Sequence, residues 1–303
     1  MEKYLVSVII PVYNGSDYVA SAIQSVLDQT YQNFEILVIN DGSKDDGLTK
    51  KAVEPFLTDP RVKYYEKENG GVSSVLDMGI ELFNGDFFNW LSHDDMFGPR
   101  SLELRVKKWI SLGEDNKYII STDTRYINEQ GKKKFRIAAR SKNINNIYDI
   151  VSSTINGCSL LIPKDAIKGH QFKVGMVYMP DYYLWAEFIS EGRRIKLVNK
   201  KITYNRVHSK QITQTKFDLL IKDFDEFEEK FIYPLVEQKE YRQLKKMVFA
   251  FTRRLSVRPF YDKYISKYKG ILVEHKKWNI FDSLHVLFDK CVSLMVKILR
   301  RIK

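Results

Sequence analysis

The feature that most restricts the fold of this chain is a short apolar run ending in two adjacent carboxylates, Phe87-Phe88-Asn89-Trp90-Leu91-Ser92-His93-Asp94-Asp95. A bounded, aromatic-rich run of this length is typical of a buried strand. In α/β folds, ligands bind at the carboxyl ends of the strands. Two adjacent anions there repel each other unless a cation joins them, and oxygen ligands suit Mg²⁺ or Mn²⁺. Alternatively, Asp94 or Asp95 caps a helix that begins near Pro99.

Strands and helices alternate through the first 110 residues. Strands are expected at residues 6–11, 34–39, 62–65 and 87–91, and helices of about 10 to 15 residues lie between them. The first strand is apolar on both faces, which is typical of a central strand. Such alternation predicts βαβ units and a parallel sheet, so the fold class is α/β. Further strands are expected at 158–162 and 202–207, a helix at 182–191, and helices beyond 215.

Length and charge restrict the function. The 303 residues can bury a large core and predict one large domain with an appendage. Residues 245–303 hold 15 Lys and Arg against 4 Asp and Glu, so they carry the entire net charge of +11. A nucleic-acid enzyme would carry that charge around its active site, so we expect no nucleic-acid partner. The sequence also lacks the glycine patterns of dinucleotide-binding and P-loop proteins.

Two observations bear on the compartment. The apolar run at 6–12 is short and ends in a turn, so no signal peptide is expected. The two cysteines, Cys158 and Cys291, are too few for a disulfide framework and favour a reducing compartment. The expected localisation is therefore cytoplasmic.

Six motifs in order resemble the family 2 inverting glycosyltransferases over about residues 5–215. The resemblance implies a GT-A-like mixed sheet flanked by helices. It places a nucleotide-binding half at 1–110, an acceptor half at 111–215, and a basic helical region at 216–303. The motifs are Val8-Ile9-Ile10-Pro11-Val12-Tyr13-Asn14, Asn40-Asp41-Gly42-Ser43, Asn69-Gly70-Gly71, Trp90-Leu91-Ser92-His93-Asp94-Asp95, Asp181-Tyr182-Tyr183-Leu184-Trp185 and Arg206-Val207-His208-Ser209-Lys210-Gln211.

The resemblance implies a nucleotide site at the strand ends. Asp41 matches the acid that accepts a hydrogen bond from uracil, because a carboxylate only accepts and the imide N–H donates. A plain turn at Asp41-Gly42 is the alternative. Gly70 and Gly71 permit close backbone approach to the sugar nucleotide, although turn geometry alone also explains them. The implied nucleotide-binding residues are Pro11, Tyr13, Asn14, Asp41, Gly70, Gly71, Ser92 and His93.

The resemblance also implies a Mn²⁺ or Mg²⁺ ion bridging the diphosphate. Asp94 matches the second acid of the family's Asp-x-Asp, whereas Ser92 replaces the first. Asp95 either orients a metal-bound water or caps the next helix, and the cap is slightly favoured. His93 has a second interpretation, an exposed loop imidazole with no task.

The later motifs supply the rest of the implied site. Asp181 matches the catalytic base, with Pro180 replacing the usual preceding acid; a helix cap is the alternative. Arg206 and His208 match a closing element that meets the diphosphate or the metal, and a solvated strand end is the alternative. The acceptor side is predicted at Asn156 and Gly157, with Trp185 either in the core or in the wall of the sugar site.

These observations predict a metal-dependent inverting glycosyltransferase. It would move a sugar from a UDP-sugar to a glycan or lipid-linked glycan in cell-surface polysaccharide synthesis, at the inner membrane face. The alternative is a catalytically silent sugar-nucleotide-binding subunit of a synthase complex, which Ser92 and Pro180 favour. A nucleotidyltransferase would be expected to open with a Gly-rich, Arg-containing loop that this chain lacks.

Residues 279–302 carry an apolar stripe, and five cations lie within it or next to it: Lys290, Lys297, Arg300, Arg301 and Lys303. Charged residues interrupt the stripe, so it is not expected to span a bilayer. It predicts either a helix lying in the interface of an anionic membrane, which we favour, or a helix packed on the catalytic domain or on a second copy in a homodimer. The stripe is Phe281, Leu284, Phe288, Cys291, Met295, Leu299 and Ile302.

Overall fold

The structure, a computed structural model, describes residues 3–132, 142–153, 155–176, 179–208, 217–254, 261–279 and 282–283. Its main sheet has five strands in the order β3-β2-β1-β4-β7. The first four are parallel, and β7 runs antiparallel to β4. The strands are β1 (Val6–Val12), β2 (Phe34–Asn40), β3 (Val62–Glu66), β4 (Phe87–Trp90) and β7 (Ile162–Pro163).

Helices cover both faces of the main sheet. Every residue of β1 is buried, as expected for a central strand. Ile9 belongs to the apolar cluster that contains Val75 of α3, whereas Ile10 belongs to the cluster that contains Ile23 of α1 and Leu102 of α4. The alternation of side chains along a strand thus sends neighbouring residues into two separate cores. The helices of this half are α1 (Val19–Leu27), α2 (Leu48–Val53), α3 (Gly71–Leu82) and α4 (Ser101–Ile110), with a 3₁₀ turn η1 (Glu54–Thr58).

A second sheet of three strands brings residues near 206 next to the loop that follows β4. Its order is β5-β8-β6, with β5 (Met96–Phe97), β8 (Arg194–Arg206) and β6 (Tyr118–Ile127). β5 follows Asp95 directly and pairs antiparallel with the end of β8, Met96 opposite Tyr204. The residues after β8 are therefore fixed beside the loop that follows β4.

The strand predicted at 158–162 is mostly wrong. Asn156 accepts a hydrogen bond from the N–H of Cys158, which begins the 3₁₀ turn η2 (Gly157–Ser159). Only Ile162 and Pro163 form the strand β7. The helix predicted at 182–191 is present as α7 (Pro180–Ser190), and the shorter helices here are α5 (Ile147–Ser152) and α6 (Lys164–Ile167).

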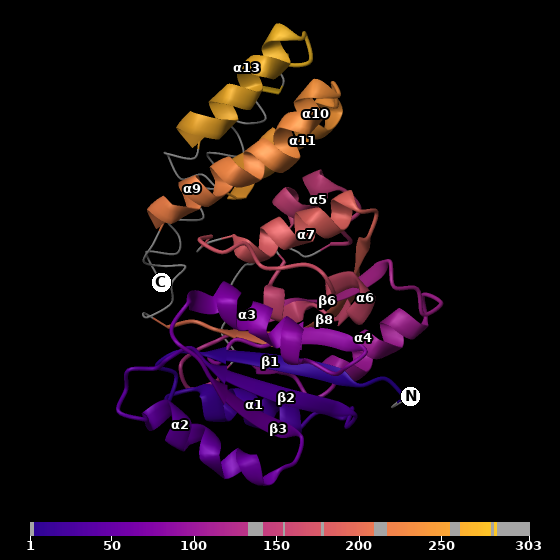
Figure 1. Cartoon of the computed structure of the whole chain (residues 1–303). Helices are drawn as coiled ribbons and strands as arrows, with labels where there is room; N and C mark the ends of the chain where they lie inside the picture. Colours follow the sequence, from indigo (N-terminus) through magenta and orange to yellow (C-terminus); the bar gives the residue numbers. More distant parts are fainter. Residues whose placement is uncertain are drawn as a thin grey trace.

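The described part of 217–283 is helical, as predicted. Figure 1 shows α9, α10, α11 and α13 stacked at the end of the molecule away from β2 and β3, with α5 and α7 between. Apolar side chains of this region, Leu244 and Tyr268 among them, belong to the same cluster as Trp185 of α7. The elements are α9 (Phe217–Phe227), the π-helical turn η3 (Glu228–Ile232), α10 (Tyr233–Glu237), α11 (Tyr241–Arg254), η4 (Tyr261–Ile265) and α13 (Ser266–Glu274).

Among the described residues, no helix has both the length and the apolar character needed to cross a bilayer. The apolar stripe predicted over 281–302 lies outside the described residues.

Candidate active site

The carboxyl ends of β1, β2 and β4 meet at one edge of the main sheet. Val12 pairs with Asn40, and Ile9 pairs with Trp90. The loops that follow these strands are therefore neighbours, as the sequence predicts.

Asp41 lies at the end of β2, only 4% exposed, and its carboxylate binds the start of α3. One oxygen accepts from the N–H of Gly70 at 2.9 Å and from Lys67 Nζ at 3.1 Å. The other accepts from the N–H of Gly71 at 2.8 Å and from Asn69 Nδ2 at 3.2 Å. An ionised carboxylate offers about four acceptor sites, so all of them are occupied. The alternative of a plain turn does not explain these four hydrogen bonds. For uracil to donate a hydrogen bond to Asp41, one of the four donors would have to leave.

The loop after β1 carries a ring that faces solvent at this edge. Tyr13 is 42% exposed, whereas Pro11 is buried. Asn14 has a φ of +48° and ties this loop to the one after β2. Its N–H donates to Ser43 Oγ at 2.9 Å, and its Oδ1 accepts from the N–H of Lys44 at 2.8 Å. Of the predicted base-binding residues, Tyr13 has an open surface against which a base can stack.

His93 is packed rather than exposed. A Cβ on Gly15 would lie 2.5 Å from the His93 ring, so only glycine fits beneath it. Burial lowers the pKa of His93, although the nearby Asp94 charge and a hydrogen bond to the Pro11 carbonyl oppose this. The ring donates a hydrogen bond to the Pro11 carbonyl. The alternative of an exposed loop imidazole is wrong.

Asp94 and His208 meet, although 114 positions separate them. Their Oδ2 and Nε2 atoms are 2.9 Å apart, and both side chains are largely buried. The ring of Tyr18, from the start of α1, lies 5.4 Å from the His208 ring. The pair sits where the loop after β4 meets the end of β8.

Asp95 does not cap α4. That helix begins at Ser101, and its N-cap, Arg100, makes no side-chain cap bond. The Asp95 carboxyl instead accepts from the N–H of Arg206 at 2.9 Å and from Asn205 Nδ2 at 3.0 Å. Burial and the neighbouring charge of Asp94 raise its pKa. Asp95 therefore holds the end of β8 against the loop after β4, and the helix cap favoured from sequence is wrong.

Arg206 is 3% exposed, and its guanidinium points into the protein. It donates to the carbonyl oxygens of Asp94 at 2.8 Å and Glu129 at 2.6 Å, and it lies 4.6 Å from the Tyr18 ring centre. These bonds fix backbone around the site. The structure thus gives Arg206 a positioning role, which differs from the predicted diphosphate contact.

The residues present fit a divalent cation that takes its remaining ligands from substrate. The described residues contain no group of three or more His, Cys, Asp or Glu arranged to hold a metal. The Ser92 hydroxyl lies 3.4 Å from Cys158 Sγ, and both Asp95 oxygens are bonded to β8. This leaves the Asp94 carboxylate, with His208 beside it. Mg²⁺ is commonly held by one or two carboxylates plus substrate phosphates, which is the pattern this pair allows.

The predicted acceptor side is built on an aromatic base. Gly157 lies against Trp90 so closely that a Cβ would be 2.1 Å from the ring. Trp185 is 1% exposed and packs 6.3 Å from the Trp90 ring, so of its two interpretations core packing is correct. Asn156 uses its side-chain oxygen to cap η2.

Asp181, like Asp94, has a carboxyl that accepts from few donors among the described residues. It is the second residue of α7, and one oxygen accepts from the N–H of Tyr182 at 2.8 Å. Within the described part of the chain it forms no ion pair. Burial raises its pKa to about 7. A carboxyl with a pKa near neutrality suits a general base.

Residues 7–168 match the family model described as "Glycosyl transferase family 2". The chain belongs to this family. It is 34% identical over 254 residues to the uncharacterized glycosyltransferase RT0329 of Rickettsia typhi, covering 78% of this chain and 74% of that protein. It is 29% identical over 232 residues to an Escherichia coli protein named UDP-Glc:alpha-D-GlcNAc-diphosphoundecaprenol beta-1,3-glucosyltransferase WfgD, covering 74% of this chain and 86% of that protein.

The fold is also similar to that of a solved structure. Staphylococcus aureus TarS 1–349 in complex with UDP-GlcNAc aligns with a TM-score of 0.59 at 14% identity, covering 94% of this chain and 79% of TarS 1–349. At this identity the likeness concerns the fold alone. The predicted GT-A-like fold, a mixed sheet flanked by helices, is confirmed.

Sequence reasoning missed several residues that build the site. Lys67 and Asn69 bind Asp41, and their only signal is proximity to Gly70-Gly71. Arg105 lies fully buried and donates to Asn89 and Thr203, which links β4 to β8. Burial lowers its pKa to about 9. A single arginine in an amphipathic helix gives no local sign that it points inward.

Proposed function

We propose that this family 2 glycosyltransferase transfers a sugar from a UDP-sugar to a glycan or lipid-linked glycan acceptor, with inversion, in cell-surface polysaccharide synthesis. The observation that carries the proposal is that two of the predicted acids keep acceptor sites to which no described residue donates: Asp94, whose carboxylate bonds to His208, and Asp181, with a pKa near 7. A UDP-sugar donor and a lipid-linked acceptor are supported by the name of WfgD, and a UDP-sugar by the TarS complex.

Each residue has a task in this proposal. Tyr13 stacks on the base at the end of β1. Asp94, with His208 beside it, would hold Mn²⁺ or Mg²⁺ on the diphosphate side of the donor, and the ion would supply positive charge against the departing diphosphate. Asp181 takes the proton of the acceptor hydroxyl while that oxygen bonds to the anomeric carbon and the bond to UDP breaks. A single displacement of this kind inverts the anomeric centre.

We place this activity at the cytoplasmic face of the cell membrane, where a lipid-linked acceptor is available. The basic region at 245–303, with a net charge of +11, supports this location. Membrane contact through 279–302, and the homodimer, stay predictions.

Two measurements test the activity. Screening UDP-sugars with and without Mn²⁺ or Mg²⁺ should show one donor from which UDP is released. Calorimetry should show metal tightening UDP binding in the wild type and not in Asp94→Ala. Equal UDP affinity with and without metal contradicts the proposed Asp94 site.

A silent subunit has one structural point in its favour. The Ser92 hydroxyl contacts Cys158, so it adds no anion beside Asp94. UDP binding with no UDP release from any donor, with acceptor glycans present, would establish this alternative.

A further inference from the structure

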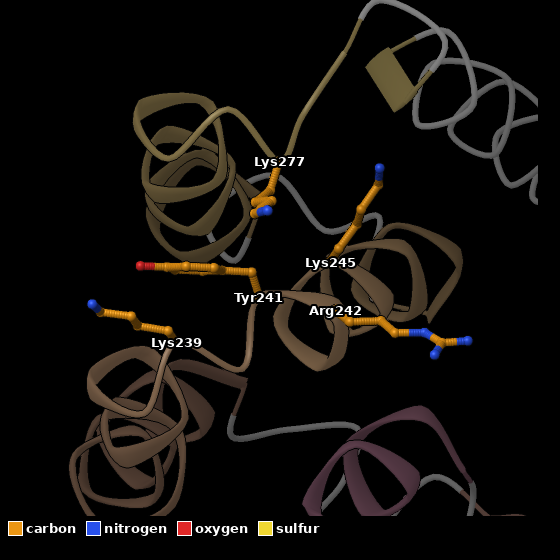
Figure 2. Close-up of a pocket in the computed structure, with 5 residues that line it drawn as sticks. All are labelled: Lys239, Tyr241, Arg242, Lys245 and Lys277. Atoms are coloured by element: carbon orange, nitrogen blue, oxygen red, sulfur yellow. The ribbon is translucent and has the colours of Figure 1, made fainter.

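The helical region at 217–283 contains a basic cavity far from the proposed active site. The cavity has a volume of about 550 Å³. Figure 2 shows Tyr241 at its centre, Lys277 above the ring, Lys239 on one side, and Arg242 and Lys245 on the other. These five residues line it.

Two of these lysines, Lys239 and Lys277, lie in the turns that end α10 and α13. The helices α10 and α13 end with the same pair of backbone hydrogen bonds. After α10, the N–H of Lys239 donates to Val236 O and the N–H of Glu240 donates to Leu235 O. After α13, the N–H groups of Lys276 and Lys277 donate in the same way to Val273 O and Leu272 O. The second residue after each helix is left-handed, with φ of +59° at Lys239 and +54° at Lys276. Glycine is the residue that this conformation favours, so Lys239, which lines the cavity, stands at a backbone position that disfavours lysine.

Helix ends alone do not account for this charge. Each helix C-terminus carries about half a negative charge, which a nearby lysine offsets. Of the four cations, Lys245 pairs with Asp282 at 2.6 Å. Lys239, Arg242 and Lys277 form no ion pair with any described residue, and all three are exposed. The charge therefore exceeds what the helix ends and Asp282 neutralise, and the cavity attracts an anion.

The arrangement distinguishes between anions. In Figure 2 the charged ends spread around the Tyr241 ring and do not converge on one point. A single soluble phosphate needs converging donors, because exposed charges act weakly in water. A surface with many phosphates can meet spread cations one by one. The ring of Tyr241 stacks on that of His275, with 4.7 Å between their centres, and forms the floor between these cations.

We propose that the cavity of Lys239, Tyr241, Arg242, Lys245 and Lys277 binds the phosphate headgroups of an anionic lipid surface. It gives the chain a lipid contact built from the helices α10, α11 and α13, separate from residues 284–303. The inference rests on the proposed location at a membrane. The test measures lipid binding, so it can refute this inference while the proposed sugar transfer is unaffected.

The test compares the full chain with the triple variant Lys239→Gln/Arg242→Gln/Lys277→Gln in cosedimentation with phosphatidylglycerol-containing vesicles. Each near-surface cation contributes about 1 kcal/mol, and 1.4 kcal/mol is tenfold, so the partition coefficient should fall about 100-fold. Lys245 is left in place because of its ion pair. Pure phosphatidylcholine vesicles should pellet neither protein through this site.

A matched control removes three exposed cations elsewhere, Lys51→Gln/Lys200→Gln/Lys201→Gln. It changes the net charge equally and should lower partition only about threefold or less. Unchanged circular dichroism and UDP binding show that both variants fold. Equal losses in the two triples overturn the proposal, as does a wild type that ignores anionic vesicles.

A last arm identifies the source of the phosphate. Calorimetry with inorganic phosphate and pyrophosphate should detect no saturable binding at millimolar ligand. Saturable pyrophosphate binding that the pocket triple abolishes, together with vesicle binding that it leaves intact, would assign the cavity to a soluble ligand and overturn the lipid proposal.

Discussion

Asp41 and Asp181 each hold a carboxyl at the start of a helix, Asp41 at that of α3 from the end of β2 and Asp181 within the first turn of α7, yet their surroundings are opposite. Asp41 accepts four hydrogen bonds, from Lys67, Asn69, Gly70 and Gly71. Among the described residues, Tyr182 donates one hydrogen bond to Asp181 at 2.8 Å and no cation pairs with it, and burial raises its pKa to about 7. The first carboxylate is occupied in holding backbone together, whereas the second has acceptor sites left for a proton.

The same contrast recurs between two adjacent residues. Asp95 is bonded to Asn205 and Arg206 and fixes β8, whereas Asp94 meets the single imidazole of His208. An acid whose acceptor sites are full acts as a structural brace. One with free sites can bind a cation or a proton, so hydrogen-bond occupancy separates the two roles where residue type does not.

The largest effect should come from Asp181→Asn. The amide keeps the shape but cannot accept the proton, so transfer should fall by roughly 10²–10⁴ while UDP binding survives. Sugar transfer and calorimetric UDP affinity are the two measurements. On the same helix, Glu187→Gln removes only a surface pair with Lys230 and should leave most activity. An Asn variant that keeps more than about a tenth of the activity, or that loses UDP binding, would refute the assignment.

The pH dependence of the wild type follows from the same carboxyl. A base with a pKa of about 7 is protonated below that pH, so kcat/KM should fall as pH drops through 7 and level off above it. Asp181→Asn should lack this limb in its residual rate. A limb centred near 4 would show that the pKa of Asp181 is not raised.

The next effect separates Asp95 from Asp94. Asp95→Ala leaves buried donors of Asn205 and Arg206 without an acceptor, at about 1–3 kcal/mol each. Urea unfolding should therefore show a loss of roughly 2–5 kcal/mol. Asp94→Ala should lose far less stability but all metal enhancement of UDP binding. Equal losses of stability in the two variants would contradict the distinction between Asp95, which fixes β8, and Asp94, which would bind the metal.

The ionised carboxyl of Asp181 should also lower the free energy of unfolding. Its pKa rises from 3.8 to about 7, so between these values the folded state binds more protons, and stability falls as pH rises through this window. Above pH 7 the full cost is present, so Asp181→Asn should be more stable than wild type at pH 8. About 4 kcal/mol is the upper limit, and partial solvent contact reduces it. The gain should vanish below pH 4, which thermal unfolding at both pH values checks.

The smallest effect concerns Lys67. Among the four donors to Asp41 its ammonium is the most easily moved, because it ends a flexible side chain and also binds Glu68 O and Ser74 Oγ. If uracil takes its place, Lys67→Met should tighten UDP binding by up to about fivefold, or about 1 kcal/mol. Calorimetry measures this, with Lys51→Met as the matched control. Weaker UDP binding in Lys67→Met would show that Lys67 contacts the nucleotide directly.

The sequence predicts what local patterns encode. Apolar runs and turns predict the strands β1 to β4 and the helix α7, because hydrophobic period and turn residues are local signals. The role of Asp95 could not be predicted, since its partners on β8 are more than 100 positions away. Trp185 was ambiguous for the same reason, because its burial depends on packing against Trp90. The strand predicted at 158–162 is too long, because the Asn156 side chain caps the 3₁₀ turn η2 where extended backbone was expected.

The bond between Asp95 and Arg206 spans 111 positions, and this has a consequence for synthesis. Strands β1 to β4 can pair once the first 90 residues have left the ribosome, yet the brace cannot form until β8 emerges. At 5–20 residues per second that interval is roughly 5–20 s. During it Asp95 is hydrated and the second sheet lacks its central strand. A nascent chain stalled before residue 194 would thus display β5 and β6 as unpaired edges, the kind of surface that chaperones cover.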